Sequence, residues 1–442
     1  MGIFNRLFGS TSSKDSQPRI RFGRYTDSYK GDEQYDFWDA SLEHFEEDNY
    51  LKAYDCFLRY LRDEKEDNVQ WEERDGVIHF EIYQGSKKII GTADHLKISA
   101  EARIAHVENP DTDFMRRLLE HNFRLKHSRF ALDGDNNITI RFDSFTLDGS
   151  PYKLYFALKE LATSADKQDD LLLDEFRGLQ AVDTEHLRPL SESEKALKFD
   201  FLTQQIGQTL SLLDRNEPPM AQYPGGYAYL LLDLIYKLDY ILRPEGFTME
   251  TLERSHRQYF ANDHAPIREK IDQLRQELQA LLDRDRSDFF REMYEVKSTF
   301  GITNPVAHDR VVSFIDGELH NMDWYVEHQY FDIAAAIPGY IVGYCMFNYA
   351  VPCPDRDLFQ LYYRIVESDF FKRLGFGNVL YKTNSGGFDK RGIRREIRQI
   401  AEKNQARYPD FQPDVGLLKY NSLVDFARSF LLMVRELNLI RR

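Results

Sequence analysis

The residues best suited to metal chemistry are Asp316, His320, Asp323 and Glu327. They follow one another at steps of four, three and four residues, so a helix here would carry all of them on one face. Carboxylate and imidazole groups on helices can bind a divalent metal, but such sites take ligands from facing helices. A solvated acidic face explains the same spacing, so we expect neither metal nor cofactor, and a metal-dependent enzyme stays the alternative.

A second candidate is the basic segment 372–407, which holds ten basic and three acidic side chains in a chain of net charge −15. Gly386-Gly387 precedes a helical pattern that carries Lys390, Arg391, Arg394, Arg395 and Arg398. A glycine-rich turn at a helix N-terminus can bind an anion, but the phosphate-loop motif G-x4-G-K-[ST] is absent. We expect these side chains to contact an acidic partner, or the chain's own acidic residues within 31–75, rather than nucleic acid.

Other catalytic motifs are absent. We find no G-x-S-x-G, H-E-x-x-H or G-x-G-x-x-G sequence in a suitable context. Asp133-x-Asp135-x-Asn137 begins like a calcium loop but lacks the later glycine and glutamate, which predicts a hairpin turn. The three cysteines, Cys56, Cys345 and Cys353, are too few and too far apart to predict a disulfide framework or a zinc site. A non-enzymatic protein of a reducing compartment, the cytoplasm, is the prediction.

Composition indicates a globular chain. Of the 442 residues, 42% are hydrophobic and 30% are charged, which suits two or three folded domains. The first residues lack the long apolar core of a signal peptide. Residues 333–351 are uncharged and long enough to cross a membrane, but they contain Pro338, Gly339 and Gly343 and have no basic flank. We therefore predict a buried core helix there and no membrane span.

The predicted order begins with a flexible polar tail at 1–30 and a helical hairpin at 31–68, with a turn near Asp48-Asn49. The spacing Tyr50-x2-Ala53-x3-Phe57 resembles one tetratricopeptide repeat, although Asp48 replaces the usual glycine and no second copy follows. An ordinary helical hairpin explains the pattern equally well. In either case the hairpin must pack on the next domain, because one repeat cannot bury its own apolar face.

Residues 69–180 predict an antiparallel α+β module. Strands are expected at 77–83, 88–98 and 101–107, a helix at 112–122, strands at 129–132 and 138–145, and a last helix with Ser150 as N-cap and Pro151 at its first position. The middle helix should bury Phe114, Leu118 and Leu119, and the last helix Leu154, Leu158, Leu161 and Ala165. The order is helix, three strands, helix, two strands, helix.

This order resembles the class I type III secretion chaperones and the related YbjN-like family. The residues that carry the resemblance are Asn122 at the end of the middle helix, the short strand 129–132, the turn Asp133-Gly134 and the apolar strand 138–142. The resemblance covers about 100 residues. It implies a bacterial protein-binding module, often a homodimer, with no catalytic residues.

Residues 191–442 predict a large all-α domain that resembles no family known to us. Helices are expected at about 306–329, 333–349, 356–373, 391–407 and 416–437, after earlier ones that include an apolar helix at 229–242. The leading hypothesis is a chaperone-like or adaptor protein that binds partner proteins. The alternatives are a metal-dependent enzyme in the helical domain and an anion- or nucleic-acid-binding protein that uses the segment 372–407.

Overall fold

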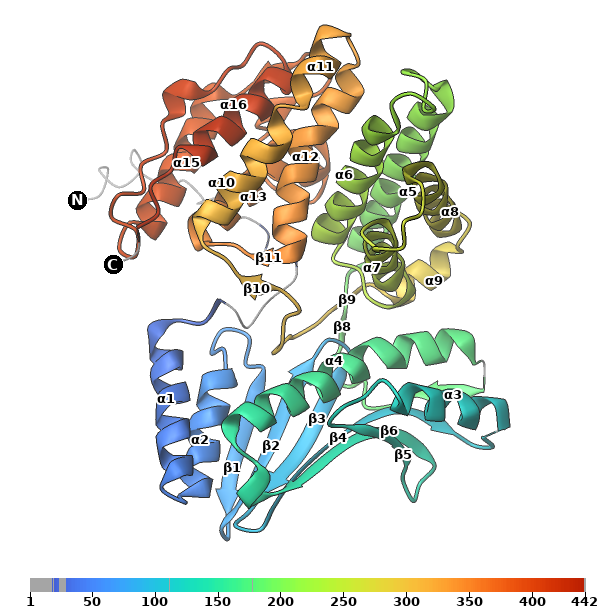
Figure 1. Ribbon diagram of the computed structural model, residues 1–442, viewed down its shortest axis with the longest axis vertical. Helices are drawn as coiled ribbons and strands as arrows, with labels where there is room; N and C mark the ends of the chain where they lie inside the picture. Colours follow the sequence, from blue (N-terminus) through green and yellow to red (C-terminus); the bar gives the residue numbers. More distant parts are fainter. Residues whose placement is uncertain (1–17, 19, 24–28, 111, 177, 441–442) are drawn as a thin grey trace, which may run out of the picture.

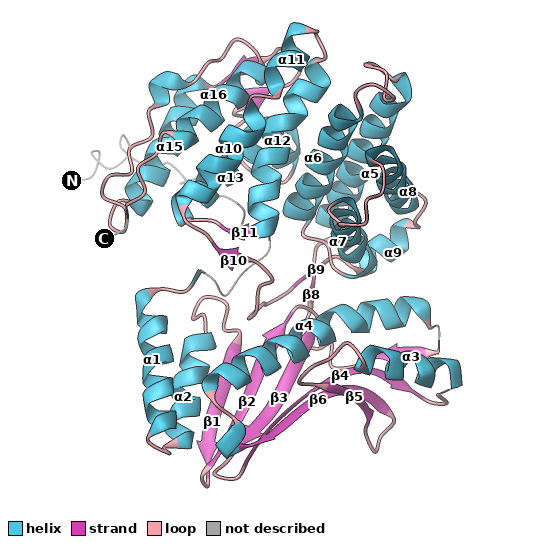
Figure 2. Cartoon of the chain, in the orientation of Figure 1, coloured by secondary structure: helices cyan, strands magenta, loops and turns pink. Residues whose placement is uncertain are grey.

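The computed structural model describes residues 18, 20–23, 29–110, 112–176 and 178–440. Most of the tail predicted at residues 1–30 lies outside these residues. Figure 1 shows two parts, one above the other, with a sheet and its covering helices below and a larger helical part above. Figure 2 shows that the long strands are confined to the lower part. The predicted fold class, an α+β module followed by an all-α region, is therefore confirmed.

The lower part begins with helices α1 (Asp32–Glu46) and α2 (Tyr50–Leu61), where the helical hairpin was predicted. Asp48 adopts the left-handed conformation in the turn between them, with φ of 59°, the role that glycine usually fills. Ala53, Phe57 and Leu61 are fully buried at helical spacing. The hairpin thus packs on the sheet, as a single pair of helices must.

The sheet is antiparallel, with its long strands in the order β1 (Val69–Arg74), β2 (Val77–Gln84), β3 (Lys87–Ala93), β4 (Lys97–Val107), β6 (Asn137–Phe145) and β5 (Arg129–Leu132). A short strand, β7 (Leu179–Ala181), also pairs with β4. The pattern of alternation holds: Ile78, Phe80 and Ile82 face the core, whereas His79 is exposed. One face of the sheet is therefore apolar and must be covered.

That face is covered by α4 (Pro151–Glu175), with α3 (Thr112–Asn122) at the far end (Figure 1). The short 3-10 turn η2 (Thr146–Asp148) leads into α4. Ser150 Oγ accepts a hydrogen bond from the Lys153 amide, and Pro151 occupies the first turn, as predicted. Leu154, Leu158, Leu161 and Ala165 are all buried, so the predicted inner face of this helix is confirmed.

Three details of the sheet differ from the prediction, and one of them is the short strand β7, which was not expected. Strand β1 was not expected, because Val69–Arg74 alternates only two apolar side chains, Val69 and Trp71, with polar ones. The turn after β3 lies at residues 94–96, so residues 97–98 belong to β4 rather than to the preceding strand. Asp94 makes this turn, because its Oδ1 accepts hydrogen bonds from the Leu96 and Lys97 amides. Four strands therefore precede α3 instead of three.

The chain enters the helical part at β8 (Arg188–Pro189), which pairs with β9 (Tyr294–Glu295) further along the chain. Between them lie α5 (Glu192–Arg215), α6 (Pro224–Leu242), α7 (Gly246–Tyr259), α8 (Ile267–Leu282) and α9 (Arg286–Arg291). The rest comprises β10 (Asn304–Pro305), α10 (His308–Leu319), α11 (Met322–Glu327), α12 (Phe331–Asn348), β11 (Tyr349–Ala350), α13 (Cys353–Val366), α14 (Ser368–Arg373), β12 (Tyr381–Lys382), β13 (Gly387–Phe388), α15 (Lys390–Asn404), η3 (Val415–Leu417) and α16 (Leu423–Arg435).

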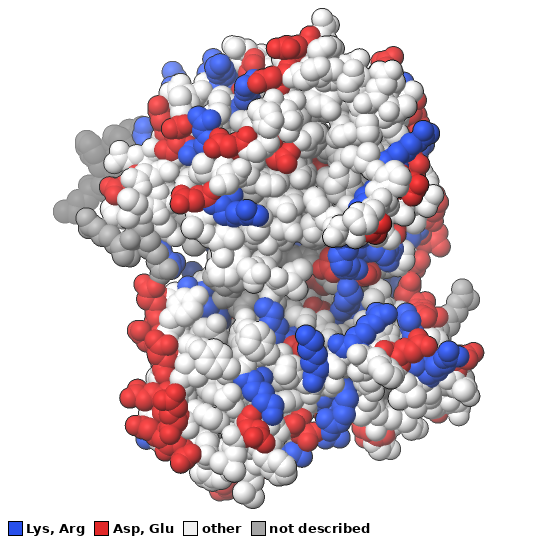
Figure 3. Space-filling model, in the orientation of Figure 1, with Lys and Arg blue, Asp and Glu red and all other residues white. Residues whose placement is uncertain are grey.

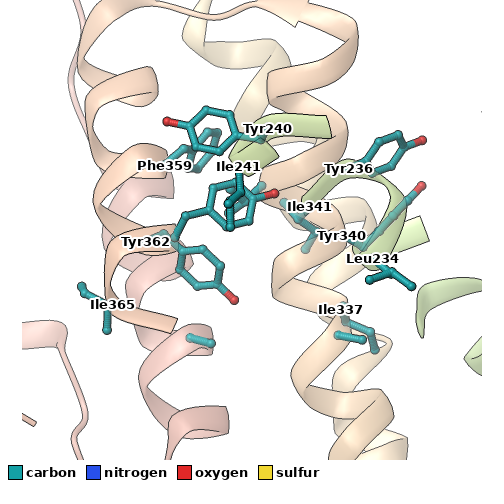
Figure 4. Close-up of a cluster of buried hydrophobic side chains, with 14 of the residues drawn as sticks. Leu234, Tyr236, Tyr240, Ile241, Ile337, Tyr340, Ile341, Phe359, Tyr362 and Ile365 are labelled. Atoms are coloured by element: carbon teal, nitrogen blue, oxygen red, sulfur yellow. The ribbon is translucent and has the colours of Figure 1, made fainter. Parts of the chain in front are cut away.

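One hydrophobic core joins these helices. Figure 4 shows side chains of α6, α12 and α13 converging, among them Tyr240, Ile341 and Tyr362. Helix α12 contains most of the uncharged stretch 333–351 and packs along α6, where Gly343 lets Tyr236 approach closely. The predicted core helix is confirmed. Among the described residues, no helix has the length and hydropathy needed to cross a bilayer.

The two parts are joined by a segment of the helical region, residues 296–300, that returns to the sheet. The Phe300 side chain is 2% exposed and belongs to the core of the lower part. Gln84 Oε1 accepts hydrogen bonds from the amides of Thr299 (3.2 Å) and Phe300 (2.9 Å). The Gly85 amide donates to the Lys297 carbonyl at 2.8 Å. The lower core is therefore completed by residues far along the chain.

Candidate functional site

The predicted metal ligands do not share one helix. α10 ends at Leu319 and α11 begins at Met322, so the chain turns between His320 and Asp323, and the single helix predicted at 306–329 is wrong. Asp316 pairs with Arg435 at 3.5 Å and Asp323 pairs with Arg428, both on α16. In the described part of the chain, no three His, Cys, Asp or Glu side chains are grouped so that they could hold a metal. The two carboxylates attach α16 to its neighbours.

The basic segment forms the exposed face of α15. Arg391, Arg394, Arg395 and Arg398 are exposed, whereas Ile393 and Ile397 on the opposite face are buried. Among the described residues, none of these four arginines forms an ion pair with a carboxylate, in residues 31–75 or elsewhere. Lys390 lies over the ring of Tyr420, with 5.2 Å between its Nζ and the ring centroid. The face is therefore available to an acidic partner.

A cavity of about 700 Å³ lies at the junction of the two parts. Its walls are α4, the ends of α6 and α12, one side of α7, the start of α13, the returning segment with residues 301–303, and the N-terminal residues 20–23. In Figure 3 the surface is hollowed between the upper and lower parts, and side chains of both charges gather there. We call this cavity the interdomain cleft.

The interdomain cleft is lined by both signs of charge. Its cationic residues are Arg21, Lys167, Arg243, Arg257, Arg356 and Lys403, and its anionic residues are Glu66, Asp166, Asp239, Glu245, Glu253 and Asp357. Several of these pair, as Lys403 does with Asp357 at 2.8 Å. The Arg243 guanidinium donates to the Val296 carbonyl at 3.5 Å and forms no ion pair in the described chain. These walls suit a ligand that carries both signs of charge and apolar groups, such as a peptide, better than a simple anion.

Three carboxylates, Asp166, Asp169 and Asp170, follow one another on α4, and Asp166 lines the interdomain cleft. Asp166 accepts a hydrogen bond from the Ser86 amide at 2.8 Å, and Asp169 pairs with buried Lys87 at 3.0 Å. Burial and the neighbouring charge of Asp169 raise the pKa of Asp166 to about 7. Burial also raises the pKa of Asp170, whose carboxylate accepts from the Tyr294 hydroxyl at 3.1 Å. Asp166 and Asp169 thus attach α4 to the β2–β3 turn, and Asp170 attaches it to β9.

The N-terminal segment 20–23 forms one wall of the interdomain cleft. The Phe22 ring lies against Phe371, Phe376 and Tyr240, with centroid distances of 5.0, 5.9 and 6.2 Å. The Gly23 amide donates to the Tyr240 carbonyl at 2.8 Å. Arg21 pairs with Glu66 of the lower part. The chain's own N-terminal segment thus lies at the edge of the cleft, in contact with both parts.

An apolar stripe lies on the outer face of α3 and just beyond it. Met115, Leu119 and Phe123 are spaced by four residues and are 38%, 61% and 95% exposed. Leu119 was predicted to face inward, but Phe114 and Leu118 fill the inner face and leave it in solvent. Next to the stripe, β5 ends the path of long strands and, within the described residues, pairs with β6 alone. An apolar helix face and an open strand edge therefore adjoin.

The loop between α3 and β5 is fixed by two side chains. Asn122 Oδ1 accepts a hydrogen bond from the Phe130 amide at 2.7 Å. The Glu160 carboxylate accepts hydrogen bonds from the amides of Lys126, His127 and Ser128, at 2.8 to 2.9 Å. Asn122 is one of the residues that carry the resemblance to secretion chaperones, and this contact gives it a physical role. The apolar stripe is held in a defined position on the module.

Comparisons with known proteins assign no family. No protein-family model matches the sequence, and no curated protein matches it either. The resemblance to the secretion chaperones therefore rests on the element order and on the few residues that carry it.

Sequence reasoning missed two features. The interdomain cleft is built from segments separated by hundreds of residues, and none of them carries a motif. The second stripe of α3 did have a signal, because Met115, Leu119 and Phe123 recur every four residues beside the core positions Phe114 and Leu118. One apolar stripe is enough to pack α3 on the sheet, so the second stripe indicates a surface that another molecule covers.

Proposed function

We propose that this chain is a non-enzymatic, chaperone-like adaptor that binds a partner protein through the apolar stripe of α3 and the open edge of β5. The observation that carries the proposal is the exposure of Met115, Leu119 and Phe123 in line on a helix whose opposite face is packed. Figure 1 shows α3 and β5 at the end of the lower part opposite to α1 and α2. A partner can approach this end without displacing another element.

The chemistry of the surface supports an interaction with an apolar segment. Full burial of one large apolar side chain stabilises a contact by about 1.5–3 kcal/mol. Positions spaced by four residues match the anchors that one amphipathic helix offers another. The open edge of β5 supplies backbone donors and acceptors that an added strand can use. The likeness of the module to secretion chaperones, which bind partner proteins, supports the same function.

The cellular setting that fits is the bacterial cytoplasm. Cys56, Cys345 and Cys353 are free thiols in the described chain. Reducing compartments maintain such thiols.

The test compares the full-length wild type with the double variant Leu119→Asp/Phe123→Asp in cells, by cross-linking and co-purification. The matched control is Phe331→Asp, which places the same charge at an exposed aromatic residue of the helical part, 52% exposed. The wild type and the control should retain a shared, specific partner that the double variant loses. Retention of that partner by the double variant would refute the proposed surface.

A second copy of the chain is the other possible occupant of the stripe. Sedimentation of the purified wild type and of the double variant separates the two cases. A wild-type dimer that the double variant converts to a monomer would assign the stripe to self-association instead of to a different protein.

The exposed arginines of α15 favour a second candidate function, the binding of an acidic partner. Four guanidinium groups on one face, with no carboxylate in reach among the described residues, can pair with acidic side chains of another protein. Reversal of Arg391, Arg394, Arg395 and Arg398 to glutamate should abolish salt-sensitive partner binding while leaving the thermal unfolding temperature nearly unchanged. Partner binding that survives the reversal would exclude this face.

A further inference from the structure

The groove that holds the N-terminal segment is formed entirely by other elements. Tyr240 packs on Tyr363 at 4.8 Å between ring centroids, and Phe371 packs on Phe376 at 5.4 Å. The Tyr240 carbonyl belongs to the last turn of α6, where carbonyl groups have no partner within the helix. The aromatic walls and the backbone acceptor therefore exist independently of the N-terminal segment.

Three successive residues of the segment are each recognised differently. The Phe22 ring enters the aromatic walls, and Arg21 pairs with Glu66. Gly23 has φ of +68°, and a Cβ there would lie 2.8 Å from the Tyr240 ring, so only glycine fits. One backbone hydrogen bond, from the Gly23 amide to Tyr240, fixes the register. Contacts of this kind are how proteins bind extended peptides.

We propose that the groove beside the interdomain cleft, formed by Tyr240, Phe371 and Phe376, is a peptide-binding site, which the chain's own residues 20–23 occupy in this structure. Its ligand is an extended segment of a partner protein with arginine, an aromatic residue and glycine in succession. This site is separate from the α3 stripe, so it extends the function beyond the adaptor surface proposed above.

The segment competes with a partner peptide for the groove because the chain attaches it close by. Lys30 is buried and its Nζ donates to the Leu61 carbonyl at 2.8 Å, so the chain is anchored only seven residues after Gly23. A short tether gives the segment an effective concentration of the order of millimolar at its groove. A partner peptide must overcome this local concentration, and release of the segment must strengthen binding in trans.

The experiment uses the full-length chain and a fluorescein-labelled synthetic peptide with the sequence of residues 18–24, measured by fluorescence anisotropy. The variant Gly23→Val expels the segment through its clash with Tyr240 and leaves the groove residues unchanged. It should bind the peptide at least about 10-fold more tightly than the wild type does. Gly76→Val, at a positive-φ glycine in the β1–β2 turn, is the matched control and should bind as the wild type does.

Two further measurements make the result decisive. Faster tryptic cleavage after Arg21 confirms that the segment has been released, and Phe22→Ala provides a second way to release it. A peptide in which alanine replaces the Phe22 position should not bind.

Released variants that fail to bind the peptide more tightly would overturn the proposal. A wild-type dimer that Phe22→Ala dissociates would also overturn it, because a second copy would then fill the groove.

Discussion

The Asp166 carboxylate occupies the space that a side chain on Gly85 would need. A Cβ on Gly85 would lie 1.6 Å from Asp166 Oδ1, and Gly85 has φ of +54°. The same Gly85 donates its amide to the Lys297 carbonyl, which belongs to the segment that returns from the helical part. The absence of a side chain at Gly85 thus allows α4, the β2–β3 turn and the returning segment to meet.

Gly85→Ala should weaken this junction. The positive φ costs an alanine about 1–2 kcal/mol, and the overlap with Asp166 adds about 1–3 kcal/mol. The matched control is Gly76→Ala, because Gly76 has φ of +75° and nothing within 4 Å of an added Cβ. Thermal unfolding of the two variants separates backbone strain from the overlap. Equal destabilisation by both would contradict the crowding at Gly85.

Asp166 should make stability depend on pH. Burial and the charge of Asp169 raise its pKa from 3.8 to about 7, so the folded state holds a proton that the unfolded chain releases. The resulting stabilisation is fully present below about pH 4 and is lost as the pH rises through about 7. In the variant Asp166→Asn the side chain cannot titrate, but its amide oxygen can still accept a hydrogen bond from the Ser86 amide. Its unfolding temperature should therefore fall less than that of the wild type between about pH 5 and about pH 8. A parallel fall in both proteins would refute the assignment.

Glu160 should also make stability depend on pH, but with the opposite sign to Asp166. The loop before β5 should lose stability as the pH falls. Burial raises the pKa of Glu160, but hydrogen bonds from three backbone amides and from Ser128 lower it by more, so the net shift is downward. Its contribution is therefore present above the unfolded pKa and is lost as the pH falls through the folded one. Glu160→Gln should cost about 1–3 kcal/mol at neutral pH, measured by urea unfolding. Glu185→Gln, at an exposed glutamate after α4, should cost far less.

The Glu160 variant also tests the adaptor surface. Loss of the loop contacts should raise amide hydrogen exchange in residues 123–132 more than elsewhere in the sheet. Uniform exchange across the module after the substitution would show that the loop does not depend on this carboxylate.

Phe300 should couple the unfolding of the two parts. Its side chain completes the lower core, so Phe300→Ala should cost about 3–5 kcal/mol. Calorimetry should show the lower part unfolding ahead of the helical part in this variant. Ile302→Ala removes an exposed side chain of the same segment, 58% exposed, and should leave the profile unchanged. A single unshifted transition for Phe300→Ala would contradict the coupling.

Local patterns were sufficient to predict most elements of the lower part. The alternation of Ile78, Phe80 and Ile82 predicted β2, and Ser150-Pro151 predicted the start of α4, because both signals lie within a few residues. Strand β1 has no such signal, since four of its six residues are polar or charged and the pairing with β2 decides its conformation. The break after His320 likewise has no glycine or proline to mark it.

The candidate sites depended on contacts that no local pattern encodes. Asn68 bonds to Thr299 across 231 residues of sequence, and Arg21 meets Glu66 across 45. The basic face of α15 was predictable because helical spacing alone places Arg391, Arg394, Arg395 and Arg398 together. The interdomain cleft and the groove for Phe22 were not, because tertiary packing creates them.

The position of Phe300 has a consequence for synthesis on the ribosome. Domains generally fold in order as the chain emerges, the N-terminal one first. Here the N-terminal sheet has emerged long before Phe300 does, so its core stays open at one place while more than a hundred further residues are translated. During that interval the nascent chain exposes an apolar pocket that the finished protein fills from within.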